Sequence, residues 1–200
     1  MGTANARDED QLKNRRFFIM DIKPIETTYN GYRFRSRLEA RWAVLFDFIG
    51  LKYLYEMEGY TNGTINYLPD FFIPSLDVFI EIKPFTEDWP SREIVSKGSL
   101  APKLVYYFCG EPYGKDGDMN YRGFYTDGDM SGDCDQYLCV CPDCGSIGIQ
   151  YSGWADRNKH KDFCTLSTLK HEKVDGRFHP LLEYAYNSAR SARFEFGESG

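Results

Sequence analysis

The sequence predicts an α/β (α+β) fold with a central mixed sheet flanked by helices and a small zinc-binding C-terminal module. Two observations support this class. Between residues 36 and 110, one amphipathic helical pattern is followed by apolar runs of strand length, which is the order expected of a helix-covered sheet. Five of the six cysteines fall between residues 134 and 164, so the character of the chain changes in its last third.

The composition is that of a globular chain with an acidic balance. With 42% hydrophobic and 27% charged residues, the chain of 200 residues can bury one good core and is not typical of disorder. Its apolar runs are too short to span a bilayer, and residues 1–19 contain no apolar signal-peptide region, so we expect a soluble cytoplasmic protein without a membrane partner. The net charge of −6 requires any nucleic-acid binding to use a local basic patch or bound cations.

Changes in composition divide the chain into three parts. Residues 1–19 are polar and are predicted to form a flexible N-terminal tail. Residues 20–135 are predicted to form the sheet-containing core. Residues 136–200 are predicted to form the zinc-binding module, followed by a C-terminal helix.

The first helix is predicted to begin after Ser36 and to end at Gly50. Its apolar residues recur at spacings of four, three and four, which places them on one helical face: Leu38, Trp42, Leu45 and Ile49. Gly50 supplies a residue that commonly ends a helix.

Apolar and aromatic runs predict the strands of the sheet. The four main runs are residues 51–58, 67–73, 77–83 and 103–110. Residues 61–66 form a turn between the first two runs, and Pro74 and Ser75 connect the second run to the third. Weaker patterns predict a short helix at 88–99, a short strand at 121–125 and a helix at 179–196.

The run at 77–83 keeps charged residues inside an apolar strand. Strand side chains alternate between faces, so Glu81 and Lys83 share one face while Val78, Ile80 and Ile82 share the other. A hairpin through Pro74 and Ser75 would bring Asp70 close to Glu81.

Two neighbouring carboxylates repel each other unless a cation lies between them, and oxygen ligands of this kind suit Mg²⁺ or Mn²⁺. A lysine beside them could orient a water or stabilise developing charge, which together with a metal is the chemistry of phosphodiester hydrolysis. The alternative is structural: Glu81 and Lys83 form an ion pair on a wet sheet face, and Asp70 is a turn residue after Pro69.

The segments Pro69-Asp70 and Glu81-Ile82-Lys83 resemble the motif of the PD-(D/E)XK nuclease superfamily. Their context, with FRSRLEARWAVLFDFIG and LKYLYE upstream, is similar to phage endonuclease I-type junction resolvases and to the nuclease subunits that cut transposon ends. The resemblance covers roughly residues 30–110, about half of the chain.

The resemblance implies a restriction-endonuclease-like core and a DNA endonuclease that depends on Mg²⁺ or Mn²⁺. It implies that Asp70 and Glu81 are metal ligands, assisted by the carbonyl of Ile82. It also implies that Lys83 is the catalytic lysine and that Glu39, on the first helix, is an additional acid.

Glu39 also has a local explanation. Ser36 and Glu39 stand at the spacing of a capping box, in which the glutamate reaches back to the start of its own helix. Four arginines surround this helix start and could contact nucleic-acid phosphates or form a solvated, charged surface: Arg33, Arg35, Arg37 and Arg41.

The cysteine-rich module contains the knuckle Cys141-Pro-Asp-Cys144-Gly, which is typical of structural Zn²⁺ sites. His160 and Cys164 complete the pattern C-x2-C-x15-H-x3-C. Cys139 competes with His160 as a ligand, and free thiols in a reducing cytosol are the alternative to zinc.

The sequence therefore predicts a metal-dependent DNA endonuclease with a zinc-stabilised C-terminal module, in a phage-encoded protein that acts in a bacterial host. The rival interpretation is an inactive adaptor of the same fold that binds nucleic acid or a partner protein. The substrate structure, the choice between DNA and RNA, and a homodimeric state stay open.

Overall fold

The computed structural model describes residues 24–84, 96–112, 125–126, 136–141, 144–151 and 179–194. The predicted tail at 1–19, most of the helix predicted at 88–99, and the predicted zinc ligands His160 and Cys164 lie outside the described residues. No helix within the described ranges is long and apolar enough to cross a membrane.

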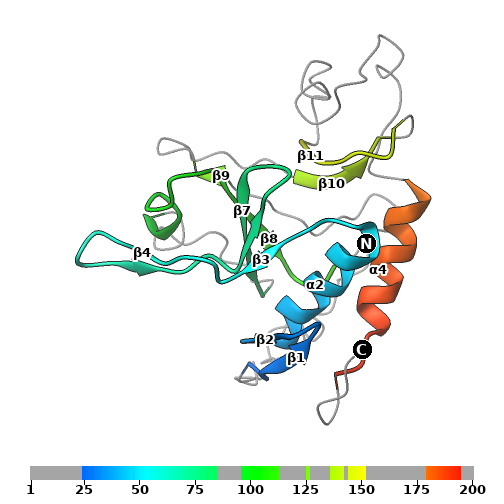
Figure 1. The fold of residues 1–200 in the computed structure, drawn as a ribbon, viewed down its shortest axis with the longest axis horizontal. Helices are drawn as coiled ribbons and strands as arrows, with labels where there is room; N and C mark the ends of the chain where they lie inside the picture. Colours follow the sequence, from blue (N-terminus) through cyan, green and yellow to red (C-terminus); the bar gives the residue numbers. More distant parts are fainter. Residues whose placement is uncertain are drawn as a thin grey trace, which may run out of the picture.

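The fold is mixed α/β, as predicted, and its centre is a mixed sheet of five strands in the order β3-β6-β7-β8-β9 (Figure 1). The strands are β3 (Leu54–Tyr55), β6 (Phe71–Ile73), β7 (Val78–Lys83), β8 (Val105–Cys109) and β9 (Tyr125–Thr126). Only β7 and β8 are parallel, and the other neighbours pair antiparallel.

Helix α2 (Arg37–Ile49) begins and ends where the sequence predicts. The hydroxyl of Ser36 accepts a hydrogen bond from the Glu39 amide, which caps the first turn. Gly50 adopts a left-handed conformation with φ of 76°, and the amides of Gly50 and Leu51 donate to carbonyls of the last turn.

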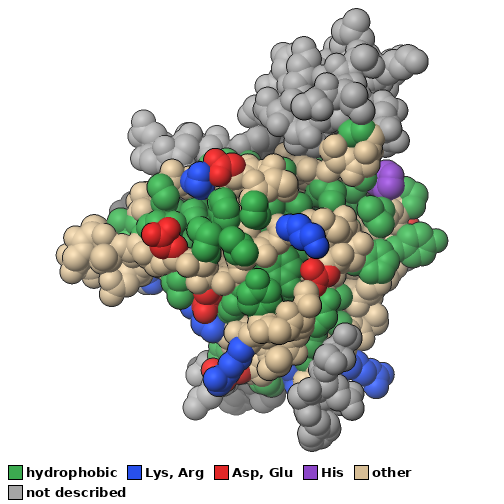
Figure 2. Space-filling view, in the orientation of Figure 1, with side chains coloured by type: hydrophobic (Ala, Val, Ile, Leu, Met, Phe, Trp, Pro, Cys, Tyr) green, Lys and Arg blue, Asp and Glu red, His purple; other side chains and the backbone are tan. Residues whose placement is uncertain are grey.

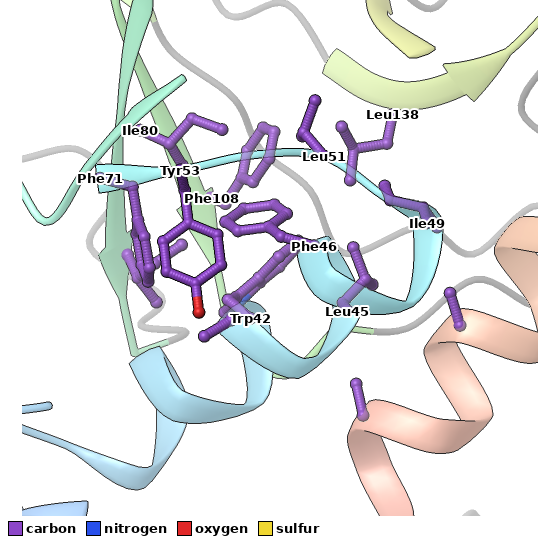
Figure 3. Packing of buried hydrophobic residues seen from close by; sticks show 14 of the residues in the cluster. Trp42, Leu45, Phe46, Ile49, Leu51, Tyr53, Phe71, Ile80, Phe108 and Leu138 are labelled. Carbon is purple, nitrogen blue, oxygen red and sulfur yellow. The ribbon is translucent and has the colours of Figure 1, made fainter. Parts of the chain in front are cut away.

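The main core lies between α2 and one face of the sheet (Figure 3). The ring centroids of Trp42 and Phe108 are 5.0 Å apart, and those of Phe46 and Phe71 are 5.3 Å apart. The same core contains the β7 residues Val78, Ile80 and Ile82, which confirms the predicted face of this strand.

A second, smaller core covers the opposite face of the sheet. It consists of Tyr67, Phe79, Val105 and Tyr107. Phe79 therefore points away from Ile80, and Glu81 and Lys83 follow it on a face that is partly polar.

Three of the described hairpins were not predicted from the sequence, and two of them precede β6. Strands β1 (Thr27–Tyr29) and β2 (Tyr32–Phe34) are joined at Asn30 and Gly31, which have positive φ angles of 46° and 81°. This Asn-Gly pair is a strong turn signal for a hairpin. Strands β4 (Tyr60–Thr61) and β5 (Asn66–Tyr67) form the second hairpin, which projects from the body of the molecule (Figure 1).

Two predicted strands were wrong in extent. The run at 51–58 contributes only β3, because Glu56 has a left-handed φ of 46° and ends the strand. The run at 67–73 is divided between β5 and β6, because Pro69 lies between them and cannot donate a ladder hydrogen bond.

The C-terminal elements share the main core. The hairpin of β10 (Gln136–Val140) and β11 (Ile147–Tyr151) contributes Leu138 and Val140 to it. Helix α4 (Pro180–Ser191) packs against α2 and contributes Leu182, Ala185 and Ala189 (Figure 1). The described elements β10, β11 and α4 are thus packed on the sheet-bearing core.

Candidate active site

The β6–β7 hairpin places Asp70 beside Glu81. In its register Phe71 pairs with Ile80 and Phe72 with Phe79, and continuing this register by one position sets Asp70 opposite Glu81. The connection is closed by two amides that donate to the Ile73 carbonyl, from Leu76 at 3.1 Å and from Asp77 at 2.9 Å. A short connection therefore determines which residue faces Glu81.

Asp70 is held on both sides of its strand. Its carbonyl accepts a hydrogen bond from the Glu56 amide at 2.8 Å, and its Oδ2 accepts one from the Ile82 amide at 2.7 Å. Only 1% of Asp70 and 5% of Glu81 is exposed. Two acids are therefore fixed side by side in a largely dry environment.

Each acid is paired with a cation. The Arg35 Nη2 donates to Asp70 Oδ1 at 2.5 Å, and Lys83 forms an ion pair with Glu81. The Tyr67 hydroxyl donates to the second oxygen of Glu81 at 3.2 Å. The ion pair of the structural alternative is thus present, but its Glu81 is buried beside a second buried acid, Asp70, while Lys83 is partly buried and Arg35 is half exposed.

The electrostatics of the cluster show that the two acids repel each other. Burial, and then the Glu81 carboxylate, raise the pKa of Asp70 well above its usual range. Burial lowers the pKa of Lys83, but the carboxylates of Glu81 and Asp70 outweigh it and the net shift is upward. Burial, followed by the charge of Glu81, also raises the pKa of Tyr67. The cluster therefore favours an additional positive charge, whether a proton or a metal ion.

Glu39 makes its direct contacts at the start of α2. Its Oε1 accepts from the Ser36 hydroxyl at 2.6 Å, and its Oε2 accepts from the Arg35 amide at 3.2 Å and from the Tyr55 hydroxyl at 2.5 Å. In a capping box the glutamate would accept a hydrogen bond from the backbone amide of Ser36. Here it accepts one from the backbone amide of Arg35 instead. Glu39 is also close enough to Asp70 for its charge to raise the pKa of Asp70, so capping and an electrostatic role at the site coexist.

Two clefts meet at this cluster. The tyrosine cleft, of about 690 Å³, is lined by residues that include Tyr67, Glu81, Lys97 and Tyr107. The helix cleft, of about 630 Å³, is lined by residues that include Arg37, Glu39, Arg41, Asp70 and Ile82. Arg35 and Lys83 border both clefts, so these two cations stand where a bound molecule would pass from one to the other.

The four predicted arginines are only partly gathered. Arg35, Arg37 and Arg41 line the helix cleft, whereas the exposed Arg33 is paired with Glu26. On the face shown in Figure 2, charged side chains are dispersed among hydrophobic and polar ones rather than gathered in one broad patch. A basic surface must therefore be local, as the acidic net charge requires.

The donor set fits a hard divalent cation with few protein ligands. Within the ranges that the structure describes, no three His, Cys, Asp or Glu side chains converge as metal ligands. The acids at the cluster are therefore two, Asp70 and Glu81, with the backbone of Ile82 beside them. Mg²⁺ commonly uses one or two carboxylates and keeps several waters.

Some site residues were missed from the sequence. Tyr67 and Tyr55 each donate to a predicted acid, but a tyrosine in an aromatic strand carries no signal that distinguishes it from a core residue. Arg35 was predicted to bind nucleic acid, and its pairing with Asp70 was not foreseen. The two residues are far apart in sequence and meet only through the fold.

The described part of the cysteine module forms a tight turn. The Gly145 amide donates to the Cys141 carbonyl at 2.8 Å, Gly145 has a φ of 72°, and the Cys144 thiol donates to the Ser146 hydroxyl at 3.0 Å. No disulfide joins the described cysteines. Cys139 and Cys141 are buried and alternate along the strand with the core residues Leu138 and Val140, so the ligand set for zinc stays a prediction.

Comparisons of this chain with protein-family models, with curated proteins and with solved structures find no match.

Proposed function

We propose that this chain is a metal-dependent DNA endonuclease of the PD-(D/E)XK type, with a restriction-endonuclease-like core, that hydrolyses phosphodiester bonds. The observation that carries the proposal is the juxtaposition of Asp70 and Glu81 by neighbouring strands, with Lys83 on the same face at the meeting point of two clefts. The raised pKa of Asp70 supports it, because an acid pair under this repulsion gains from a bound cation.

In this proposal Asp70, Glu81 and the Ile82 carbonyl hold Mg²⁺ or Mn²⁺. Such an ion, when bound, polarises a phosphoryl oxygen and lowers the pKa of a bound water. The Tyr67 hydroxyl keeps the Glu81 carboxylate oriented, and the Ile82 amide does the same for Asp70.

Lys83 acts as a positive charge rather than as a base. Its raised pKa keeps the ammonium group protonated at neutral pH, so it cannot take a proton from the attacking water. It orients that water and stabilises the negative charge that develops on the phosphoryl oxygens. Arg35 holds Asp70, and Glu39 fixes the Arg35 backbone from the start of α2.

One observation favours the rival function, an adaptor without turnover. Arg35 and Lys83 already pair with both acids, so a chain in which these pairs persist would bind nucleic acid or a partner protein without cutting. The two functions differ in whether a divalent cation enters the cluster.

A cleavage panel tests the proposal. The full chain is incubated with branched, single-stranded and duplex DNA and with the matching RNA, in Mg²⁺, Mn²⁺ or EDTA. We expect metal-dependent cutting that falls by about 10²-fold or more in Glu81→Gln and Lys83→Met. Lys103→Ala is the control, because Lys103 pairs with Asp77 at the far end of the same strands. Wild-type protein that binds DNA but does not cut it with either metal establishes the adaptor instead.

We also propose a structural Zn²⁺ site built on Cys141 and Cys144, with Cys164 and either His160 or Cys139 as further ligands. The tight turn at Gly145 supports it, because zinc knuckles use such a turn to bring two thiolates together. Metal analysis of wild type and Cys141→Ser tests it. One equivalent of zinc that is lost in the variant is the expected result, and a zinc-free wild type refutes the site.

A further inference from the structure

Four arginines surround a pocket between the two long helices. Where α2 begins and α4 ends, a pocket of about 340 Å³ is lined by Arg37 and Arg41 from α2 and by Arg190 and Arg193 from the end of α4. Its remaining lining is Ser191, Ala192 and Phe194. Lys or Arg side chains are visible beside the lower end of α4 in Figure 2. We call this the arginine pocket.

The arginine pocket concentrates four guanidinium groups. Arg41 forms an ion pair with Glu111, whose side chain is half exposed. The Nε atoms of Arg37 and Arg41 are buried without a hydrogen-bond partner in the described part of the chain. Guanidinium groups stay charged at any physiological pH, so a pocket lined by four of them favours an anion.

The shape of the pocket suits a phosphate group. Guanidinium groups present planar pairs of N–H donors that match phosphate oxygens, and more than one can bind the same phosphate. The first turn of α2 brings the positive end of its helix dipole near Arg37, and the Glu39 carboxylate in the same turn offsets part of it. The carbonyl end of α4 opposes this, but Arg190 lies in its last turn and offsets it.

The arginine pocket adjoins the helix cleft. Arg37 and Arg41 line both, and the helix cleft also contains Asp70 and Lys83. A nucleic-acid strand with one phosphate near Lys83 therefore finds its next anion site along the first two turns of α2, and then between α2 and α4.

We propose that the arginine pocket binds a backbone phosphate of the nucleic-acid strand that is held at the Asp70–Glu81 cluster, at a position further along that strand. This inference rests on the proposed nuclease function and extends it to the end of α4. It assigns to Arg190 and Arg193 a role in holding the substrate.

The test measures binding of fluorescent duplex and single-stranded DNA to the full chain in Ca²⁺ or EDTA, over a series of salt concentrations. Each lost phosphate contact lowers the slope of log affinity against log salt by about 0.7–0.9. We expect Arg190→Ala and Arg193→Ala each to weaken binding and to reduce this slope by about one contact. Lys103→Ala removes the same charge at a distance and is expected to leave affinity and slope near wild type.

A second variant acts in the opposite direction. Glu111→Gln releases Arg41 from its ion pair, so it is expected to tighten DNA binding at low salt. Asp77→Asn is its matched control, because it releases Lys103 in the same way and asparagine tolerates the positive φ of 56° at that position. If both substitutions tighten DNA binding equally, the change in net charge alone explains the effect, and the proposed phosphate site in the arginine pocket is refuted.

The outcomes separate this inference from the nuclease proposal. Wild-type affinity and salt slope in both arginine variants, with metal-dependent cleavage intact in the wild type, overturn the arginine pocket and leave the nuclease. If both arginine variants lose DNA binding and the wild type does not cut DNA, the phosphate site in the arginine pocket is supported, the nuclease function is refuted, and the chain is a DNA-binding adaptor. Thermal unfolding of each variant verifies that it is folded.

Discussion

The substitution Glu39→Gln separates the two roles of Glu39. In the wild type its carboxylate accepts from the Ser36 hydroxyl, the Arg35 amide and the Tyr55 hydroxyl. A glutamine can keep a hydrogen bond to all three groups. Its carbonyl oxygen accepts from Arg35 and Tyr55, and its amide donates to the Ser36 hydroxyl, which has two acceptor sites and uses one for the backbone amide of residue 39. The Ser36 hydroxyl then no longer donates to residue 39, and because Ser36 is only partly buried its proton can bind water.

The expected change in the free energy of unfolding is therefore small, within about 1 kcal/mol, because neutral hydrogen bonds replace charge-assisted ones. Removal of the whole side chain in Glu39→Ala leaves all three donors without this partner and is expected to cost about 1–3 kcal/mol. Ser36→Ala, which removes the cap and keeps the charge, is expected to cost about 1 kcal/mol. In a chain of this length each kcal/mol corresponds to roughly 2–4 °C in the unfolding midpoint.

Cleavage is expected to respond differently. Glu39→Gln keeps the fold but removes a negative charge near Asp70 that would help to attract the proposed metal ion, so we expect DNA cleavage to fall by about 10²-fold, equivalent to about 2.7 kcal/mol. Ser36→Ala is expected to cut within a few-fold of wild type. The assay is single-turnover cleavage in Mg²⁺ with thermal unfolding on the same samples. Wild-type cleavage by Glu39→Gln would show that Glu39 is only a helix cap.

Three further outcomes are expected. Leu138→Ala should lower the free energy of unfolding by about 2–5 kcal/mol in a single transition, because Leu138 is 1% exposed in the core shared with α2; two separate transitions in denaturant would contradict the shared core. In EDTA, the free energy of unfolding of the wild type, relative to that of Asp70→Asn, should fall as the pH rises from about 3.9 toward the raised pKa of Asp70. The reason is that the Asp70 carboxyl loses its proton first in the unfolded chain and keeps it in the folded chain. A difference that does not change with pH would show that the pKa of Asp70 is not raised. Mg²⁺ at a hundredfold excess over its dissociation constant should stabilise the wild type by about 2.7 kcal/mol and Glu81→Gln much less, and an equal increase in calorimetry would place the metal elsewhere.

Local patterns explain what the sequence could predict. The period of two along 77–83 was enough to place Glu81 and Lys83 on one face, and Ser36 and Gly50 were enough to bound α2. The short connection at Pro74 was enough to predict that Asp70 lies beside Glu81, because a tight hairpin allows few strand registers.

Long-range contacts explain what the sequence could not predict. Arg35 pairs with Asp70, and Arg37 lines one pocket with Arg193, only because α2 packs on the sheet and α4 packs beside α2. The hairpin at Asn30 and Gly31 is different, since its turn signal is local and needs no long-range contact. The zinc ligands His160 and Cys164 lie outside the described residues and stay a prediction.

The packing of α4 on α2 has a consequence for how the protein is made. The two helices come from opposite ends of the described chain, so this part of the fold depends on contacts with a large sequence separation. During synthesis the apolar face of α2 that meets α4 stays uncovered until residues 180–191 have left the ribosome, and the pocket that Arg190 and Arg193 complete does not exist before then. In the nuclease that we propose, a nascent chain that already contains Asp70, Glu81 and Lys83 would therefore lack one phosphate site and bind DNA less tightly until this last helix has docked.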